Sequence, residues 1–473
     1  MPSHSTSAPA DDLRPTLGLP SAAAVVAGSM IGSGIFLVTP DVARHTGSTG
    51  MTLLIWAGTG AFTALGAWSY GKLAGAYPVA GGQYAFLREA WGRIPAFLYG
   101  WVFFWVLQTG TLAAVAVAFA RYAGVLLPAV NSAPIGPLGL STEKLLSIAC
   151  LVGLTFYNTR GIQYGAALQN VFTVLKTLAL LGLIACGLMA GGGLLWQSGA
   201  HDWTLALPHA SGDGAWLAAL TTLAAATVGP LFASDSWNTV TFIGAEVKNP
   251  RQTLPKALAL GTGLVVTLYF LANLAYVNTL TLPQIQSAPD DKVAALMMTT
   301  IFGPAGAAAM AAIILVSTFG CLNGILLSGA RVFYAMARDG LLFQRFAATH
   351  PTTHSPNTSL WAQCGWACAL ALSGTYGQLL GYIIFTALAF YALTIGGLFR
   401  LARRDTGAAH FTGFMDKAMA GLYIAGASAL ALLLLVSPDQ RQASLAGIGF
   451  TLLGLPAYAL WRRFAHKKAA VIE

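Results

Sequence analysis

Long apolar segments separated by short polar loops make up most of the chain. A helix that crosses a lipid bilayer needs about 20 mainly apolar residues. Twelve segments have about this length, at 19–45, 50–75, 95–127, 142–160, 166–190, 215–246, 256–280, 305–337, 356–373, 377–402, 417–437 and 443–463. The pattern predicts an all-α polytopic membrane protein with 12 transmembrane helices. An even number of crossings puts both termini on one side of the membrane.

The first apolar segment is interrupted by glycines. Its middle reads GSMIGSG over residues 28–34, and each glycine weakens a helix by about 1 kcal/mol relative to alanine. Open backbone at that depth is tolerated only where it lines a cavity or is buried in protein. Its free N–H and C=O groups suit a ligand with both a carboxylate and an ammonium group. We therefore expect residues 28–34 to bind an amino acid or amine.

The sixth apolar segment has a second interruption. Breaker and polar residues replace apolar ones in its middle, which reads GPLFASDSWNT over residues 229–239. In transporters built from inverted repeats, two interrupted helices in corresponding positions meet at the binding site. The first and sixth segments are five apart, which indicates a 5+5 inverted repeat with discontinuous helices 1 and 6.

The predicted domain organisation follows from this repeat. It consists of a first repeat at 19–190, a second repeat at 215–402 and two further helices at 417–463. Residues 1–18 are rich in Pro, Ser and Thr and are predicted to form a disordered N-terminal tail, while residues 464–473 form a C-terminal tail.

Asp235 is the only acidic residue that the pattern places near the middle of the membrane. A carboxylate at that depth is costly and indicates a functional site, through contact with a cationic substrate group, a proton or an ion. The alternative is a helix cap that accepts hydrogen bonds from the second half of the broken helix. Both roles can coexist.

Lys176 is the only Lys or Arg deep within a predicted span. Because it lies near the centre of the fifth segment, its ammonium group should point into the bundle, towards carbonyls or hydroxyls. It is interpreted as a fixed cation that supports the broken first helix, as a proton carrier, or as a purely structural lysine. In the eighth segment, Ser317 and Thr318 can reach a buried ammonium group or a helix end, although hydroxyls also serve helix packing.

Two further features leave alternatives open. The sequence PVAGGQY at 78–84, followed by a run with Arg88, Glu89 and Arg93, predicts either an amphipathic interfacial helix or an ordinary loop. The aromatic residues Trp105, Phe232 and Trp237 are candidates for gating a substrate cavity, or they serve packing alone.

Composition excludes several classes of protein. With 56% hydrophobic and 9% charged residues, the chain has too few charges for a water-soluble surface. The net charge of +9 is spread over short loops, so it indicates orientation with cytoplasmic termini rather than nucleic-acid binding. The five cysteines lack metal-ligand spacing, and no P-loop lysine, zinc motif or nucleophile elbow is present. We therefore expect no cofactor, no metal and no enzymatic activity.

The chain resembles the amino acid-polyamine-organocation superfamily, and within it the L-type amino acid transporters and their bacterial relatives. The resemblance covers about residues 17–463. It rests on GSMIGSGIF at 28–36, PVAGGQYAFLREAWG at 78–92, QNVFTVLKTLAL at 169–180, SWNTVTFIGAEVKNPRQTLPKA at 236–257, STFGCLNG at 317–324, SGARVFYAMARDGLL at 328–342 and GIGFTLLGLPAY at 447–458. It implies the LeuT-type fold.

The resemblance also implies roles for particular residues. The substrate's carboxylate would bind the backbone around Ser33 and Gly34. Its α-ammonium group would meet carbonyls near Met30, Phe232 and Asp235. Lys176 would take the place of the sodium ion used by other members of the fold, which implies sodium-independent transport. Asn238 would lie near the substrate.

The chain departs from this family at several positions. Residues 128–141 contain no Cys, so we expect no disulfide to a heavy chain and a free-standing monomer or homodimer. Asp235 stands where members for large neutral substrates have Gly and where one for dibasic amino acids has Asp. Ser234 replaces a frequent Tyr, and Ala245 replaces the first of two usual acids before an Asn-Pro pair.

The sequence therefore predicts a sodium-independent amino acid transporter of the cell (inner) membrane that works by alternating access. Exchange of cationic and/or neutral L-amino acids is the preferred mode, proton-coupled symport of amino acids or polyamines is the alternative, and a channel is a distant one. The predicted substrate-binding residues are Ser29, Met30, Ile31, Gly32, Ser33, Gly34, Phe232, Ser234, Asp235, Trp237 and Asn238. Lys176, Ser317 and Thr318 are predicted to form a coupling site or sodium-site substitute.

Overall fold

The computed structural model describes residues 13–135, 139–197, 199–205, 214–373, 376–404, 411 and 413–469. Within these ranges the chain is helical, with isolated β-bridges in place of strands. The first half contains α1 (Leu19–Met30), α2 (Gly34–Leu37), α3 (Thr39–Thr46), α4 (Thr49–Ala76), α5 (Gln83–Trp91), α6 (Arg93–Val102), η1 (Phe103–Leu107), α7 (Gln108–Leu126), α8 (Thr142–Asn158), α9 (Ile162–Ala190) and η2 (Leu194–Trp196).

The second half follows the same plan of long apolar helices joined by short ones. It contains α10 (Ala215–Ala233), α11 (Thr239–Phe242), η3 (Gly244–Glu246), α12 (Pro250–Thr279), α13 (Leu282–Gln286), η4 (Pro289–Asp291), α14 (Val293–Phe302), α15 (Pro304–Arg338), η5 (Gln344–Ala347), α16 (Asn357–Ser373), α17 (Tyr376–Ala402), α18 (Phe414–Val436) and α19 (Arg441–Ala469). The short apolar helix α14 was not among the predicted elements.

The predicted polytopic, all-helical fold is confirmed. Ten segments of the described chain are long and apolar enough to cross a membrane. The other two predicted spans correspond to α8 and α16, which have 17 residues each. At 1.5 Å per residue such a helix is about 25 Å long, near the short limit for a span. Several helices expose large apolar side chains, such as Leu178 and Leu432, as lipid contact requires.

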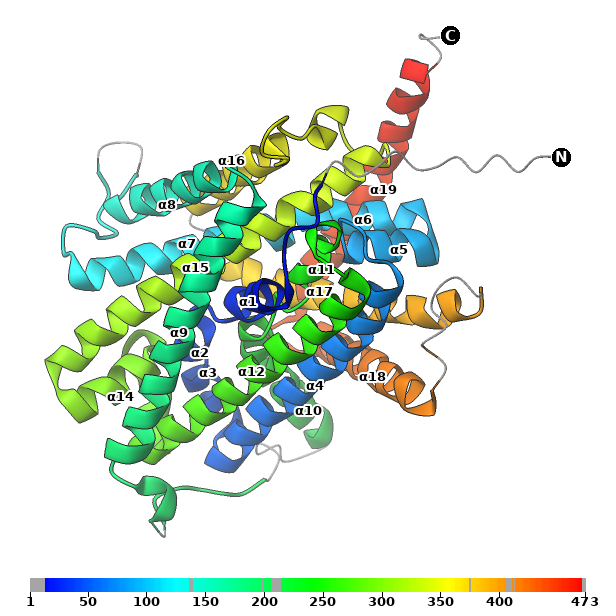
Figure 1. The fold of residues 1–473 in the computed structure, drawn as a ribbon. Helices are drawn as coiled ribbons and strands as arrows, with labels where there is room; N and C mark the ends of the chain where they lie inside the picture. Colours follow the sequence, from blue (N-terminus) through cyan, green and yellow to red (C-terminus); the bar gives the residue numbers. More distant parts are fainter. Residues whose placement is uncertain are drawn as a thin grey trace.

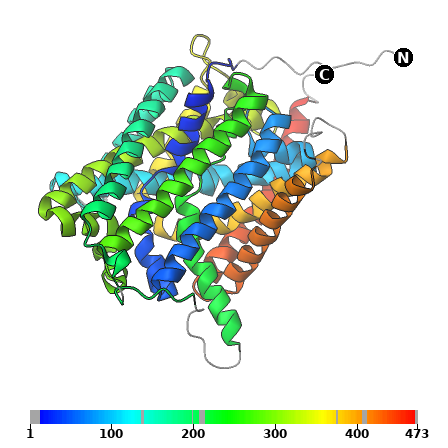
Figure 2. The same cartoon turned by 60° about the horizontal axis from the view of Figure 1, so that its bottom comes forward.

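Helix α1 lies in the interior of the bundle. It packs against α9, α12 and α15, and Figure 1 shows it near the centre of the molecule, between these helices. Along its length α12 also packs against α4, and the two helices run side by side in both views. Figure 2 shows that α1 begins at the same end of the bundle where α19 ends. This arrangement agrees with an even number of crossings.

The segment before α1 packs onto the protein, in contrast to the disordered tail predicted for residues 1–18. Leu13 and Leu17 are buried. The backbone N–H groups of Thr16 and Leu17 donate to the carbonyl of Glu246 at 2.8 and 3.0 Å, and the N–H of Lys248 donates to the carbonyl of Leu17 at 2.8 Å. Apolar burial and backbone pairing therefore order residues 13–18, while residues 1–12 lie outside the described ranges.

A fully buried ion pair lies beside this segment. The guanidinium group of Arg331, on α15, donates to both carboxylate oxygens of Glu246 at 2.8 and 3.0 Å. Both side chains are at most 2% exposed. Because a buried charge without a partner is costly, the pair fixes η3 against α15.

Substitution of Glu246 by Gln should therefore destabilise the protein. The change leaves the buried charge of Arg331 uncompensated, which costs about 3–5 kcal/mol. We expect a clear loss of thermal stability in detergent, and partial recovery when Arg331→Met is added. As a control, Asp290→Asn breaks an exposed pair with Lys292 and should have little effect. Equal stabilities of Glu246→Gln and Asp290→Asn would contradict the role of the buried pair.

Candidate functional site

Both predicted helix breaks are present, and they meet inside the bundle. Helix α1 ends at Met30, and Ile31 has an extended backbone with φ −73° and ψ 91°. Helix α10 ends at Ala233, and Ser236 adopts a positive φ of 66° before α11 begins. A Cβ atom on Gly34 would lie 2.6 Å from the Cβ of Ala233. The first residue of α2 therefore needs to be glycine, because it touches the end of α10.

Lys176 caps the open end of α1. Its side chain is 1% exposed. The ammonium group donates to the carbonyls of Gly28 and Ile31, the latter at 2.9 Å, and lies 3.4 Å from the carbonyl of Ser317. The hydroxyl of Ser317 donates to the carbonyls of Ile31 and Gly32 at 3.1 and 2.9 Å. Two predicted residues are thus brought to the break, where they satisfy carbonyls that the interrupted helix leaves open.

Thr318 is not brought to the break. Its hydroxyl donates to the carbonyl of Ile314, at 2.7 Å within its own helix. The side chain next to α1 is instead that of Cys321, whose thiol lies 3.0 Å from the carbonyl of Ser29. Since Cys321 is one helical turn after Ser317, both lie on the face of α15 that meets α1.

Tyr269, on α12, links the two breaks. Its hydroxyl donates to the carbonyl of Met30 at 2.9 Å and lies 3.2 Å from the carbonyl of Ala233. The last residues of α1 and α10 therefore share one donor. Sequence reasoning missed this residue, although a tyrosine in the middle of an apolar segment carries a hydroxyl that needs a partner.

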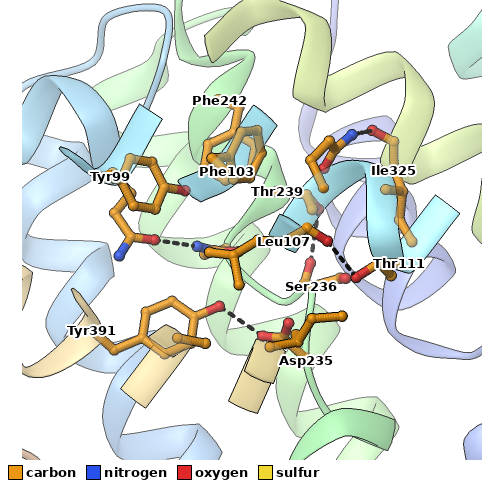
Figure 3. Close-up of a pocket in the computed structure, with 15 residues that line it drawn as sticks. Tyr99, Phe103, Leu107, Thr111, Asp235, Ser236, Thr239, Phe242, Ile325 and Tyr391 are labelled. Carbon is orange, nitrogen blue, oxygen red and sulfur yellow. Dashed lines mark hydrogen bonds between the residues drawn. The ribbon is translucent and has the colours of Figure 1, made fainter. Parts of the chain in front are cut away.

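Asp235 lies at the edge of a pocket beside the second break. Its carboxylate accepts a hydrogen bond of 2.6 Å from the hydroxyl of Tyr391, on α17, and Figure 3 shows the two groups facing each other. Helix α11 begins after Asn238 without a side-chain cap, so Asp235 does not cap it. The contact to Tyr391 holds the carboxylate towards the pocket, where it can meet a cationic group.

The third span supplies the opposite wall of this pocket. This wall is lined by Tyr99 from α6, by Phe103 and Leu107 from the π-helical turn η1, and by Gln108 and Thr111 from α7. A π-helical turn within a span is frequent at functional sites, because it changes the direction of the side chains that follow. Figure 3 shows Tyr99, Phe103, Leu107 and Thr111 around the pocket together with Ser236 and Thr239.

Carboxamide groups form a polar chain in the same pocket. The side-chain nitrogen of Asn238 donates to Gln83 at 3.0 Å, and Gln83 donates to the hydroxyl of Thr394 at 3.2 Å. Gln108 donates to the carbonyl of Ile325 at 2.8 Å. Gln83 is the first residue of α5, so the segment after PVAGG forms a helix rather than an ordinary loop, and its first residue lines the pocket. Gln83 and Gln108 were missed, although each is a polar residue in a mainly apolar stretch of the sequence.

The remaining predicted residues are divided between the break and its surroundings. Trp237 packs against Tyr70 and Tyr391, with ring centroids 4.7 and 5.2 Å apart, and lines a second pocket that shares Asp235 with the first. Trp105 packs against Trp366 and lines neither pocket. The residues that lie within or beside the breaks but do not line the first pocket are Ser29, Met30, Ile31, Gly32, Ser33, Gly34, Phe232 and Ser234.

A membrane-embedded helix bundle in which two spans break and meet beside a polar pocket defines the class of secondary transporters. Residues 17–452 match the model of the amino acid permease family, so the chain belongs to that family. The resemblance found in the sequence is confirmed, and the chain is a transporter rather than an enzyme.

Similar proteins share most of their length with this chain. It is 30% identical to the Asc-type amino acid transporter 1 of Mus musculus over 83% of this chain and 71% of that protein. It is 30% identical to the large neutral amino acids transporter small subunit 2 of Mus musculus, over 81% of this chain and 70% of that protein. It is 29% identical to the b(0,+)-type amino acid transporter 1 of Mus musculus, over 85% of this chain and 79% of that protein.

Replacement of Gly34 by Ala should separate the two breaks. The added methyl group would overlap Ala233, whose Cβ and Cα would lie 2.6 and 2.9 Å away, and such overpacking costs about 1–3 kcal/mol. We expect lower thermal stability and loss of amino acid uptake. Gly58→Ala, in α4, is a matched control, because no atom lies within 4 Å of its added Cβ. If both variants keep the stability and uptake of the parent protein, the contact between the breaks is unimportant.

Proposed function

We propose that this protein is a sodium-independent amino acid transporter that exchanges one amino acid for another by alternating access. The observation that carries this proposal is the ammonium group of Lys176 on the open end of α1. It occupies a position among the carbonyls of Gly28, Ile31 and Ser317. Oxygen atoms of this kind are the ligands of alkali cations in transporters with broken helices. A built-in cation therefore supports transport without sodium.

In this proposal the substrate's polar groups bind at the two breaks. The carboxylate binds backbone N–H groups around Ser33 and Gly34, between α1 and α2. The α-ammonium group binds carbonyls near Met30, Phe232 and Asp235. Tyr269 already donates to the carbonyl of Met30, but a carbonyl oxygen has two lone pairs and can accept a second hydrogen bond.

The pocket around Asp235 favours a cationic side chain on the substrate. Its carboxylate supplies a negative charge, and the rings of Tyr391 and Trp237 lie next to it. A carboxylate beside aromatic faces attracts a cation through both charge and ring electrostatics. We expect Asp235 to be the residue that decides between dibasic and neutral substrates in this protein.

A ligand screen by thermal stability tests this assignment. A ligand that binds only the folded protein stabilises it by about 2.7 kcal/mol at one hundred times its Kd. We expect arginine, lysine or ornithine to raise the melting temperature of the purified protein, and Asp235→Asn to abolish that increase. The control Asp290→Asn, at an exposed carboxylate, should respond as the parent protein does. Stabilisation by neutral amino acids alone would contradict a cation-selective pocket.

Transport measurements in liposomes distinguish exchange from symport. We expect uptake of labelled amino acid to require unlabelled amino acid inside, to saturate, and to be unaffected by replacing sodium with choline. Uptake into liposomes without internal substrate, driven by a pH gradient and abolished in Lys176→Ala, would show proton symport instead. Uptake that neither saturates nor accelerates with internal substrate would indicate a channel.

We further propose a cell (inner) membrane location with both termini cytoplasmic, and a carrier that works as a monomer or homodimer without a heavy chain. The distribution of Lys and Arg supports the orientation, and α1 begins at the end of the bundle where α19 ends. Residues 128–141 contain no cysteine, and the five cysteines are free thiols in apolar helices. These observations support a carrier that forms no disulfide with a second subunit.

A further inference from the structure

A groove opens between α4 and α12, and it shares no lining residue with the substrate pocket. It has a volume of about 490 Å³. Most of its lining comes from the last turns of α4 and the first turns of α12, with Phe411 from the segment before α18. The α4 and α12 residues include Trp68, Gly71, Lys72, Arg251, Pro255 and Ala259. It therefore lies at the end of the bundle where α1 begins, at the level where a span meets the membrane interface.

Small residues create the floor of this groove. A Cβ atom on Gly71 would lie 3.4 Å from the Cα of Pro255, and one on Gly75 would lie 3.3 Å from the carbonyl oxygen of Arg251. The two helices thus approach each other closely at these glycines. The larger side chains of Trp68 and Lys72 stand at the sides, so the groove stays open towards the outside.

The groove carries an excess of positive charge. The ammonium group of Lys72 lies 3.0 Å from the carboxylate of Asp416, which also accepts from the indole N–H of Trp68 at 3.1 Å. Arg251, which is exposed, lines the other wall. Among the described residues, Asp416 therefore pairs with Lys72, while Arg251 on the opposite wall has no carboxylate beside it. The exposed Lys256 follows on the same helix. This balance attracts an anion.

An apolar track continues from the charged end of the groove. The residues one to three turns before Trp68 on the exposed face of α4 are small, namely Ala57, Gly58, Ala61 and Ala64. Helix α12, which packs against α4, exposes Leu260 and Leu264, at 59% and 42%. The exposed small residues of α4 leave room for an alkyl chain along this helix. Trp68 is 45% exposed and stands between the charged and apolar parts, as tryptophans do at membrane interfaces.

We propose that this groove binds one phospholipid with an anionic headgroup. The phosphate lies between Lys72 and Arg251, and an acyl chain follows the strip of small residues on α4. The charges select an anionic over a zwitterionic headgroup, because basic residues near the membrane surface attract anionic lipids. The apolar strip selects a lipid over a soluble phosphate. The lipid thereby bridges α4 and α12, and α12 carries Tyr269, the donor shared by the two breaks.

Native mass spectrometry of the full-length protein tests the proposal without a transport assay. The detergent-purified protein is titrated with phosphatidylglycerol, with phosphatidylcholine of the same acyl chains, and with glycerol phosphate. We expect one phosphatidylglycerol to be retained at concentrations where the other two are not. Equal retention of both lipids, or binding of glycerol phosphate alone, would overturn the proposal.

Matched variants locate the site. Lys72→Gln and Arg251→Gln should each weaken phosphatidylglycerol binding about fivefold, the ratio expected for one basic residue near an anionic lipid. Ala259→Trp keeps the charges but fills the groove at an exposed position, and should abolish binding. Arg345→Gln, at an exposed cation on η5 outside the groove, should leave binding unchanged. If Ala259→Trp and Arg251→Gln bind phosphatidylglycerol as the parent protein does, the groove is not the site.

Discussion

The ammonium group of Lys176 is the contact on which the centre of the molecule depends. A helix that stops in the middle of a bilayer leaves carbonyl groups that water cannot reach, and each would be costly without a donor. Lys176 donates to two of these carbonyls, and Ser317 donates to a third and shares one with Lys176. The break in α1 persists because other helices supply the hydrogen bonds that its own backbone lacks.

The donors come from three different helices. Lys176 belongs to α9, Ser317 and Cys321 belong to α15, and Tyr269 belongs to α12. The end of α1 is therefore held by the elements that surround it, and a movement of any one of them changes its hydrogen bonds. Tyr269 extends this coupling to α10, since its hydroxyl lies near the last carbonyl of that helix as well.

Much of the fold could be predicted because each apolar segment, and each interruption within one, extends over many residues. The glycines around Gly32 and the polar run around Asp235 located both breaks to within a few residues. Single polar residues gave weaker signals. Gln83, Gln108 and Tyr391 enter the pocket because of how their helices are rotated and packed, and an apolar pattern that surrounds a helix on all sides does not reveal its rotation. For the same reason Ser317 and Thr318 were indistinguishable, although Ser317 faces α1 and Thr318 bonds to its own helix.

The pairing of residues 16 and 17 with the backbone around Glu246 has a practical consequence for handling this protein. Those residues lie only a few positions before α1, and they are joined to the segment that connects α11 to α12. A purification tag or fluorescent fusion attached close to residue 13 would disturb these backbone hydrogen bonds. The last turns of α19 project from the bundle in Figure 1, so fusions are better tolerated at the opposite terminus.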